Sequence, residues 1–130
     1  MARNDLARAV LTNIPITPRH TLILPIRHVS RFSEATNNER IAMFDLAQHI
    51  ANTLTEKFGA EGFNYAWNEG KAAGQNVEHL HLHIVPRTEG DTGIYEYDPR
   101  KFLYRPGSRE ISPQDELLAA AEELRNAINS

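Results

Sequence analysis

Apolar and polar residues alternate most regularly over residues 79–85, where three histidines are separated by leucines before the run ends at Pro86. Strict alternation predicts a strand, because successive side chains of a strand point to opposite faces of a sheet. His79, His81 and His83 would then share one face, with neighbours roughly 7 Å apart, and the apolar side chains would pack on the other. This short strand carries half of the six histidines in the chain.

The rest of the chain divides into strand-like and helical segments. The run that follows His20 is apolar throughout, as expected for a strand near the middle of a sheet. Residues 7–12 form a modest apolar stretch, the strand-like runs are residues 21–26 and 63–68, and the helical runs are residues 39–58 and 112–128. We therefore expect a long amphipathic helix laid on a sheet and a second helix that closes the domain.

Local signals mark the ends of both helices. The candidate N-caps of the first are Ser33, Thr36 and Asn37. Gly59 would end this helix, and Ser112 with Pro113 would start the second. The stripe expected to be buried in the first helix is Ile41, Phe44, Ala47, Ala51, Leu54 and Phe58, and in the second Leu117, Leu118, Ala121, Leu124 and Ile128. The alternating aromatics Phe63, Tyr65 and Trp67 are expected to point into the core.

Composition limits the class of protein. The 130 residues are 41% hydrophobic and 24% charged, which is typical of one globular domain spanning residues 1–130. A net charge of -3 argues against a broad nucleic-acid surface, so any nucleotide would be a small ligand. The absence of cysteine excludes disulfides, thiolate nucleophiles and cysteine-based zinc sites. We find no leader and no stretch of membrane-spanning length, and so expect a cytoplasmic protein.

The face shared by the three histidines has three interpretations. Imidazole can attack as a nucleophile, transfer a proton or bind a metal near neutral pH. A zinc site would use the rings as ligands, and a surface or structural cluster would need no chemistry. Residues 68–76 favour catalysis, because their two glycines and several amides form a turn whose backbone N–H groups can bind an anion. A phosphate beside the imidazoles would use such a turn.

Residue type alone leaves the role of two other features open. An isolated histidine such as His20 is most often a core or boundary residue. Residues 95–105 hold aromatic and basic side chains. We expect them to form a surface loop with anchoring aromatics, the alternative being a lid or a contact with a partner.

The run from Gly74 to Arg87 resembles the signature of the histidine triad family, in which histidines alternate with apolar residues and two more apolar residues follow. The segments Pro18-Arg19-His20 and Arg27-His28-Val29 also fit, so the resemblance covers residues 9–92. It implies an α+β fold with an antiparallel sheet of about five strands, one long helix and a C-terminal helix. It also implies a homodimer and hydrolysis or transfer at the α-phosphate of a nucleotide.

By this resemblance His81 is the nucleophile and forms a nucleotidyl-imidazole intermediate. Physical chemistry agrees, since a neutral imidazole nitrogen is a competent nucleophile when its other nitrogen donates to a fixed acceptor. The resemblance implies that this acceptor is a backbone carbonyl, here that of His79. His83 would bind the phosphate, protonate the leaving group and then help to activate water. His20 matches a further family histidine that supports the active site.

The substrate-binding residues implied by the resemblance are mostly amides. Gln75 would contact the phosphate near the scissile bond, and Gly74 belongs to the same lead-in to the histidines. Asn68 matches the asparagine of a supporting Asn-x-Gly turn, and Asn13 falls near the residue that binds ribose hydroxyls. Asn76 stands where the family commonly has Ser or Thr, so an amide would replace a hydroxyl donor.

The leading expectation is a nucleotide hydrolase acting on a dinucleoside polyphosphate or an adenosine phosphoramidate. Its partner would be a small nucleotide, with no nucleic-acid polymer and no membrane. The protein would hold no cofactor, although magnesium could accompany a polyphosphate by neutralising its charge. The alternatives are a nucleotide-binding sensor with little turnover, motivated by Asn76, and a zinc protein. The zinc ligands would be His79, His81, His83 and possibly His20.

Overall fold

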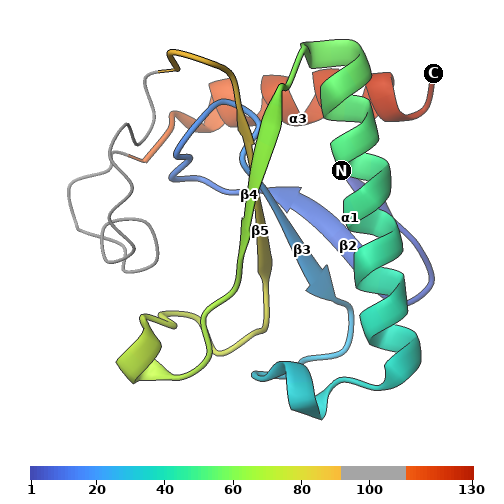
Figure 1. Cartoon of the computed structure of the whole chain (residues 1–130), viewed down its shortest axis with the longest axis vertical. Helices are drawn as coiled ribbons and strands as arrows, with labels where there is room; N and C mark the ends of the chain where they lie inside the picture. The colour runs from blue at the N-terminus through green and yellow to red at the C-terminus, as the bar shows by residue number, and fades with distance from the viewer. Residues whose placement is uncertain (92–110) are drawn as a thin grey trace.

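The computed structural model describes residues 1–91 and 111–130 and shows a sheet with two helices (Figure 1). The described strands are β1 (Ala2–Arg3), β2 (Ala7–Leu11), β3 (Thr21–Pro25), β4 (Gly62–Ala66) and β5 (Leu82–Arg87). The helices are α1 (Asn37–Phe58) and α3 (Gln114–Ile128), with 3-10 turns η1 (Phe32–Glu34) and η2 (Lys71–Ala73). Among these residues the strand order is β1-β2-β3-β5-β4, every pair antiparallel, which confirms the α+β fold. The loop expected at residues 95–105 lies outside the described residues.

Helix α1 begins and ends where local chemistry predicts. The Thr36 hydroxyl accepts a hydrogen bond from the Glu39 N–H, and the Glu39 carboxylate accepts one from the Thr36 N–H, which forms a capping box. Gly59 follows the last residue at φ 72°, in the left-handed region that favours glycine. Thr36 is therefore the N-cap among the three candidates, and the helix starts at Asn37.

The expected buried stripe of α1 is wrong at two positions. Ile41 and Phe44 are 57% and 48% exposed. The buried residues of this helix are Glu39, Met43, Leu46, Ala47, Ile50, Ala51, Thr53 and Leu54. The exposed and the buried apolar residues both follow a helical period, so periodicity alone does not decide which set faces the sheet.

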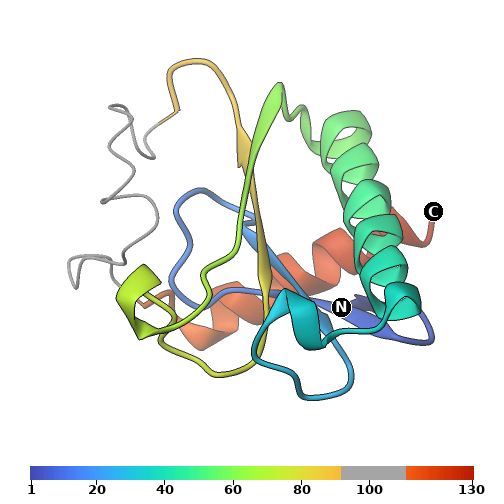
Figure 2. The same cartoon turned by 60° about the horizontal axis from the view of Figure 1, so that its bottom comes forward.

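One face of the sheet packs against α1 and forms the core (Figures 1 and 2). The strand residues of the hydrophobic core on this face are Ala7, Ala9, Ile23, Leu82 and Ile84. Helix α3 crosses α1 at a steep angle and inserts Leu124 into the same core (Figure 1). Leu22 of β3 and His83 of β5 are cross-strand partners, and alternation directs both to the opposite face. Packing on one face thus leaves the other for chemistry.

The start of α3 differs from the expected cap. Pro113 occupies the N-cap without a side-chain hydrogen bond, and the helix begins at Gln114. The N–H of Ser112 instead donates to the carbonyl of Asn13 (2.7 Å), so Ser112 ties the chain to the β2–β3 connection. Leu118, expected in the buried stripe, is exposed. No helix among the described residues has both the length and the apolar content needed to cross a bilayer.

The aromatics of β4 are more exposed than expected. Tyr65 and Trp67 are 52% and 41% exposed, because β4 lies at the edge of the described sheet and ends at Ala66. Trp67 stacks on Phe32 of η1, with ring centroids 5.1 Å apart. Phe63 packs against the core, as expected.

Candidate active site

The three histidines lie where a loop enters β5. His79 and His81 precede the strand, and His83 is its second residue. The expectation of a strand from residue 79 is therefore wrong at its start, because the N–H of Leu80 donates to the carbonyl of Val29 (2.7 Å), which lies outside the sheet. The alternation nevertheless survives: the intervening leucines are buried, and the three imidazoles are partly exposed.

The backbone just before His81 orients its ring. Nδ1 of His81 lies 2.8 Å from the carbonyl oxygen of His79. A carbonyl only accepts, so Nδ1 carries the hydrogen, and in the neutral ring Nε2 holds the lone pair. The reactive nitrogen of this imidazole is therefore Nε2.

A second chain of hydrogen bonds sets the positions of the hydrogens on His20 and His83. The N–H of Ile16 donates to Nδ1 of His20 (3.1 Å), and Nε2 of His20 lies 2.9 Å from Nδ1 of His83. A main-chain amide only donates, so the hydrogen of neutral His20 is on Nε2 and points to His83. Nδ1 of neutral His83 is then an acceptor, and its hydrogen is on Nε2. The buried His20 thus acts through His83.

The two chains of hydrogen bonds meet where His81 contacts His83. Their rings pack edge to face, with centroids 4.9 Å apart and an interplanar angle of 65°. A phosphate placed against Nε2 of His81 is therefore within reach of the N–H of His83. Among residues 1–91 and 111–130, no group of three or more His, Cys, Asp or Glu side chains is arranged to hold a metal ion.

His79 is fixed by the end of β3. Its Nε2–H donates to the carbonyl of Pro25 (2.8 Å), and its ring lies 4.8 Å from the ring of His28. Burial lowers the pKa of His79 below the ordinary 6.5, and the charges of His28, Arg8 and His81 act in the same direction. The hydrogen bond to Pro25 opposes this shift without reversing it. A neutral His79 keeps positive charge away from the neighbouring nucleophile.

Residues 68–76 form a glycine-containing turn around η2, but the N–H groups of Gly70, Ala73, Gly74 and Gln75 are hydrogen-bonded within it, so anion binding by this backbone stays a prediction. Gly70 and Gly74 flank η2 with φ of 84° and 88°. The buried Gln75 holds the turn: its Oε1 accepts from the N–H of Gly70 (2.7 Å), and its Nε2 donates to the carbonyl of Ser30 (2.9 Å). Both ends of this amide contact backbone, and a phosphate contact through the second N–H of Nε2 stays a prediction.

A cavity of about 230 Å³ opens beside His79 and His81. Its walls are Leu11, Thr12, Asn13, Leu22, Leu24, Val77, His79 and His81. This volume is below the roughly 300–1,000 Å³ of typical ligand pockets, so it would hold one part of a nucleotide. Asn13 lies in this wall, and its ribose-binding role stays a prediction. Gly74 and Asn68, both half-buried, and the exposed Asn76 are not among the residues that line it, and their roles stay predictions.

The sequence did not identify five residues of this wall, namely Leu11, Thr12, Leu22, Leu24 and Val77. Residues 22–26 are apolar throughout, so the pattern could not show which side chains turn away from the core. Pairing with His83 supplies that information, since cross-strand partners share a face. For Thr12, the signal in the sequence was its position next to Asn13.

Known proteins resemble this chain over most of its length. A family model described as HIT domain matches residues 1–90. The Bis(5'-adenosyl)-triphosphatase of Dictyostelium discoideum is 32% identical over 123 residues, which cover 93% of this chain and 79% of that protein. The AP-4-A phosphorylase of Mycobacterium tuberculosis is 36% identical over 115 residues, covering 88% of this chain and 55% of that protein. The structure of a Hit-like protein involved in cell-cycle regulation from Bartonella henselae aligns with a TM-score of 0.79 at 27% identity, over 97% of this chain and 83% of that chain.

Proposed function

This chain belongs to the HIT domain family, the histidine triad proteins, and from that premise we propose that it hydrolyses dinucleoside polyphosphates at the α-phosphate. The observation that carries the proposal is the hydrogen bond from Nδ1 of His81 to the carbonyl of His79, which leaves Nε2 as a nucleophile beside His83. The name of the Dictyostelium relative supports a dinucleoside polyphosphate as substrate. An adenosine phosphoramidate could be cleaved by the same nucleophile and is the second candidate.

The proposed first step is attack by His81. Its Nε2 forms a bond to the α-phosphorus, and the P–O bond to the rest of the polyphosphate breaks with its electron pair on that oxygen. The Nε2–H of His83 donates to a phosphate oxygen and stabilises the charge that develops there. A polyphosphate leaving group is stable as an anion near neutral pH, so in this proposal it departs without the proton that the family resemblance assigns to His83.

Water removes the nucleotide in the proposed second step. In the intermediate, Nδ1–H of His81 still donates to the His79 carbonyl, so the substituted ring carries a positive charge and is a good leaving group. Water attacks phosphorus, the P–N bond breaks, and its electron pair returns to Nε2 while one proton of the water passes to solvent. The ring ends in its starting tautomer.

Intact-mass analysis after brief mixing with a dinucleoside polyphosphate tests this mechanism. We expect a nucleotidyl adduct on the wild-type chain and none on His81→Ala. His49→Ala is the matched control, because His49 is an exposed residue of α1 outside the site and its removal should leave the adduct unchanged. Folded wild type that yields neither adduct nor product would contradict the proposal. Nucleotide binding without product would favour the sensor.

The acceptor in the second step can be identified with the same sample. The Mycobacterium tuberculosis relative is named a phosphorylase, and in such an enzyme inorganic phosphate takes the place of water. With water the transferred nucleotide is released as a monophosphate, and with phosphate it is released as a diphosphate. Product analysis with and without added phosphate therefore separates hydrolysis from phosphorolysis.

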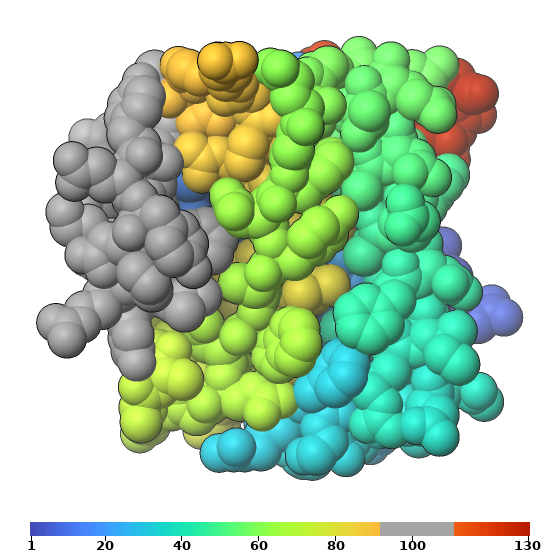
Figure 3. Space-filling view, viewed as in Figure 1, coloured from blue at the N-terminus to red at the C-terminus, as the bar shows by residue number. Residues whose placement is uncertain are grey.

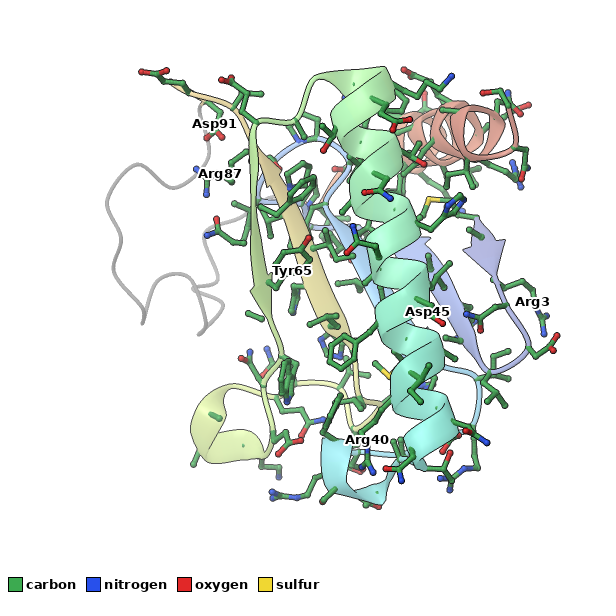
Figure 4. All side chains as sticks on the ribbon, turned by 45° about the vertical axis from the view of Figure 1, so that its right-hand side comes forward. Arg3, Arg40, Asp45, Tyr65, Arg87 and Asp91 are labelled. Atoms are coloured by element: carbon green, nitrogen blue, oxygen red, sulfur yellow. The ribbon has the colours of Figure 1, made fainter. Side chains whose placement is uncertain are left out.

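We also propose that two copies pair through β4 and the adjacent part of α1. The exposed apolar residues Ile41, Phe44, Tyr65 and Trp67 come from these elements or the residue after them, and we call them the α1–β4 surface. Figure 3 shows β4 beside α1 on one face of the molecule, and in Figure 4 Tyr65 projects from β4 beside α1. β4 is an edge of the described sheet, and an edge strand offers unpaired backbone groups. A twofold pair would satisfy them and cover the aromatics.

A further inference from the structure

The hydrogen bonds of His20 depend on the connection between β2 and β3. His20 is only 1% exposed, and its Nδ1 accepts from the N–H of Ile16 in this connection. The N–H of His20 itself donates to the carbonyl of Thr17 (3.2 Å), one residue further on. A movement of this loop that displaced Ile16 would therefore remove the backbone contact that keeps the hydrogen of neutral His20 on Nε2.

Thr17 connects this loop to the strand that carries His83. Its side-chain hydroxyl donates to the carbonyl of Pro86 (2.8 Å) across 69 residues of sequence, and the residue is only 6% exposed. Pro86 lies three positions after His83 on β5. The loop is thus attached to His20 through main-chain contacts and to the His83 strand through one hydroxyl.

The register of the sheet explains why a side chain makes this contact. The β3–β5 ladder ends at the pair Thr21 and Ile84. Just before it, Arg19 adopts a left-handed φ of 68°, so the chain before Thr21 does not continue the extended conformation of β3. The carbonyl of Pro86 therefore has no β3 backbone donor in the ladder, and the Thr17 hydroxyl provides the hydrogen bond. Removing that hydroxyl would leave a partly buried carbonyl without this donor.

We propose that Thr17 is a positioning residue for catalysis. Its hydroxyl fixes the loop relative to β5 and so maintains the hydrogen bonds from Ile16 to His20 and from His20 to His83. These hydrogen bonds place the N–H of His83 on the substrate side of its ring. The proposal rests on the proposed function for its kinetic consequence. The proton positions themselves do not depend on which substrate is cleaved.

A matched set of variants tests the role of the hydroxyl. Thr17→Val removes it at nearly constant shape, and Thr17→Ser retains it. Thr53→Val is the control, because Thr53 is 7% exposed and its hydroxyl donates to the carbonyl of His49 inside α1, away from the histidines. The readouts are kcat and KM for a dinucleoside polyphosphate, the melting temperature, and two-bond ¹H–¹⁵N spectra that report the tautomers of His20 and His83.

We expect Thr17→Val to lower kcat about 10- to 100-fold with a smaller change in KM, because displacing a catalytic group by a fraction of an ångström has effects of this size. Its spectra should show mixed tautomers for His20, while Thr17→Ser keeps the wild-type tautomers and most of kcat. Thr53→Val should lower only the melting temperature. A Thr17→Val variant that loses stability like Thr53→Val but keeps kcat and the tautomers would overturn the proposal.

The wild-type spectrum is a second test that needs no variant. Hydrogen on Nε2 of both His20 and His83 is expected, and hydrogen on Nδ1 of His20 would overturn the inference even if Thr17→Val failed to fold. A wild-type chain with the expected tautomers but no turnover would instead count against the proposed function. The two failures are therefore distinguishable.

Discussion

At the scale of single residues, the hydrogen between Nε2 of His20 and Nδ1 of His83 makes the site respond differently to two classes of substrate. In the neutral pair, His83 donates a hydrogen bond but has no proton to give away, because losing Nε2–H would leave an anionic ring. A polyphosphate leaving group needs no proton, as described above. An amine leaving group does, so cleavage of a phosphoramidate requires the pair to carry one additional proton.

This difference predicts a pH dependence that changes with substrate. The ratio of kcat for an adenosine phosphoramidate to kcat for a dinucleoside polyphosphate should fall as pH rises, because only the amine leaving group needs the additional proton. Taking the ratio removes any effect of pH on the attack by His81, because that step is common to both substrates. Parallel pH profiles for the two substrates would contradict this assignment.

His79 should titrate below the ordinary imidazole range. Burial lowers its pKa from 6.5, and neighbouring His28 contributes to the shift, so His28→Gln should move the His79 midpoint upward. With this lowered pKa, the unfolded chain binds a proton at His79 more readily than the folded chain does. His79 therefore contributes stability above pH 6.5 that is lost as pH falls through the lowered pKa. Titration of the ring signal by NMR measures the midpoint, and a value above 6.5 would contradict the prediction.

Residue type alone predicted part of this site. The alternation of residues 79–83 identified three of the four histidines, since the pattern lies within five residues. His20 on its own was expected to be a core or boundary residue, and only the family resemblance indicated its role. Its partner His83 is 63 residues away, and no local pattern reports a contact across that distance.

At the scale of elements, one ion pair fixes the start of α1. Arg27 donates to both carboxylate oxygens of Glu39, at 3.1 and 2.8 Å, and Glu39 also closes the capping box with Thr36. These contacts lower the pKa of Glu39 to about 2, with the Arg27 hydrogen bond as the largest cause. The same carboxylate therefore stabilises the helix end and the segment that leads from β3 to it.

Glu39→Gln should lower the free energy of unfolding at pH 7 by about 1–3 kcal/mol, the combined scale of a lost cap and a paired carboxylate. The wild-type advantage is present above the ordinary pKa of 4.5 and is lost as pH falls from there towards 2. Urea denaturation at pH 7 and pH 3 measures it. Glu56→Gln, at an exposed position later in α1, should have little effect. An equal loss for Glu39→Gln at both pH values would contradict the argument.

The elements themselves were predictable to different degrees. The sequence predicted the bounds of helix α1 to within two residues, because its capping box and Gly59 are local signals. The beginning of β5 was not, since the contact of Leu80 with Val29 replaces a strand contact and depends on the folded chain. The exposure of Ile41 and Phe44 was missed for the same reason, because the sequence contains two apolar sets with helical spacing and only the fold selects one.

At the scale of the whole molecule, the α1–β4 surface predicts a concentration-dependent dimer. Tyr65→Asp would place two carboxylates near a twofold interface, and like charges in such a position cost several kcal/mol. We therefore expect dimer affinity to weaken by more than about 100-fold. Light scattering across a dilution series measures this, with Leu118→Asp on the exposed side of α3 as a control. Wild type that stays monomeric at high concentration would contradict the proposed pairing.

The order in which contacts can form follows from the pairing of β3 with β5. Helix α1 forms from residues that are neighbours in the sequence. The His20–His83 hydrogen bond joins residues 63 positions apart and requires β3 to pair with β5, although α1 and β4 lie between these two strands in the sequence. Closing so long a segment is slow compared with forming a helix. During refolding, circular dichroism would therefore recover before enzymatic turnover, which makes turnover the more stringent report of a completed native state.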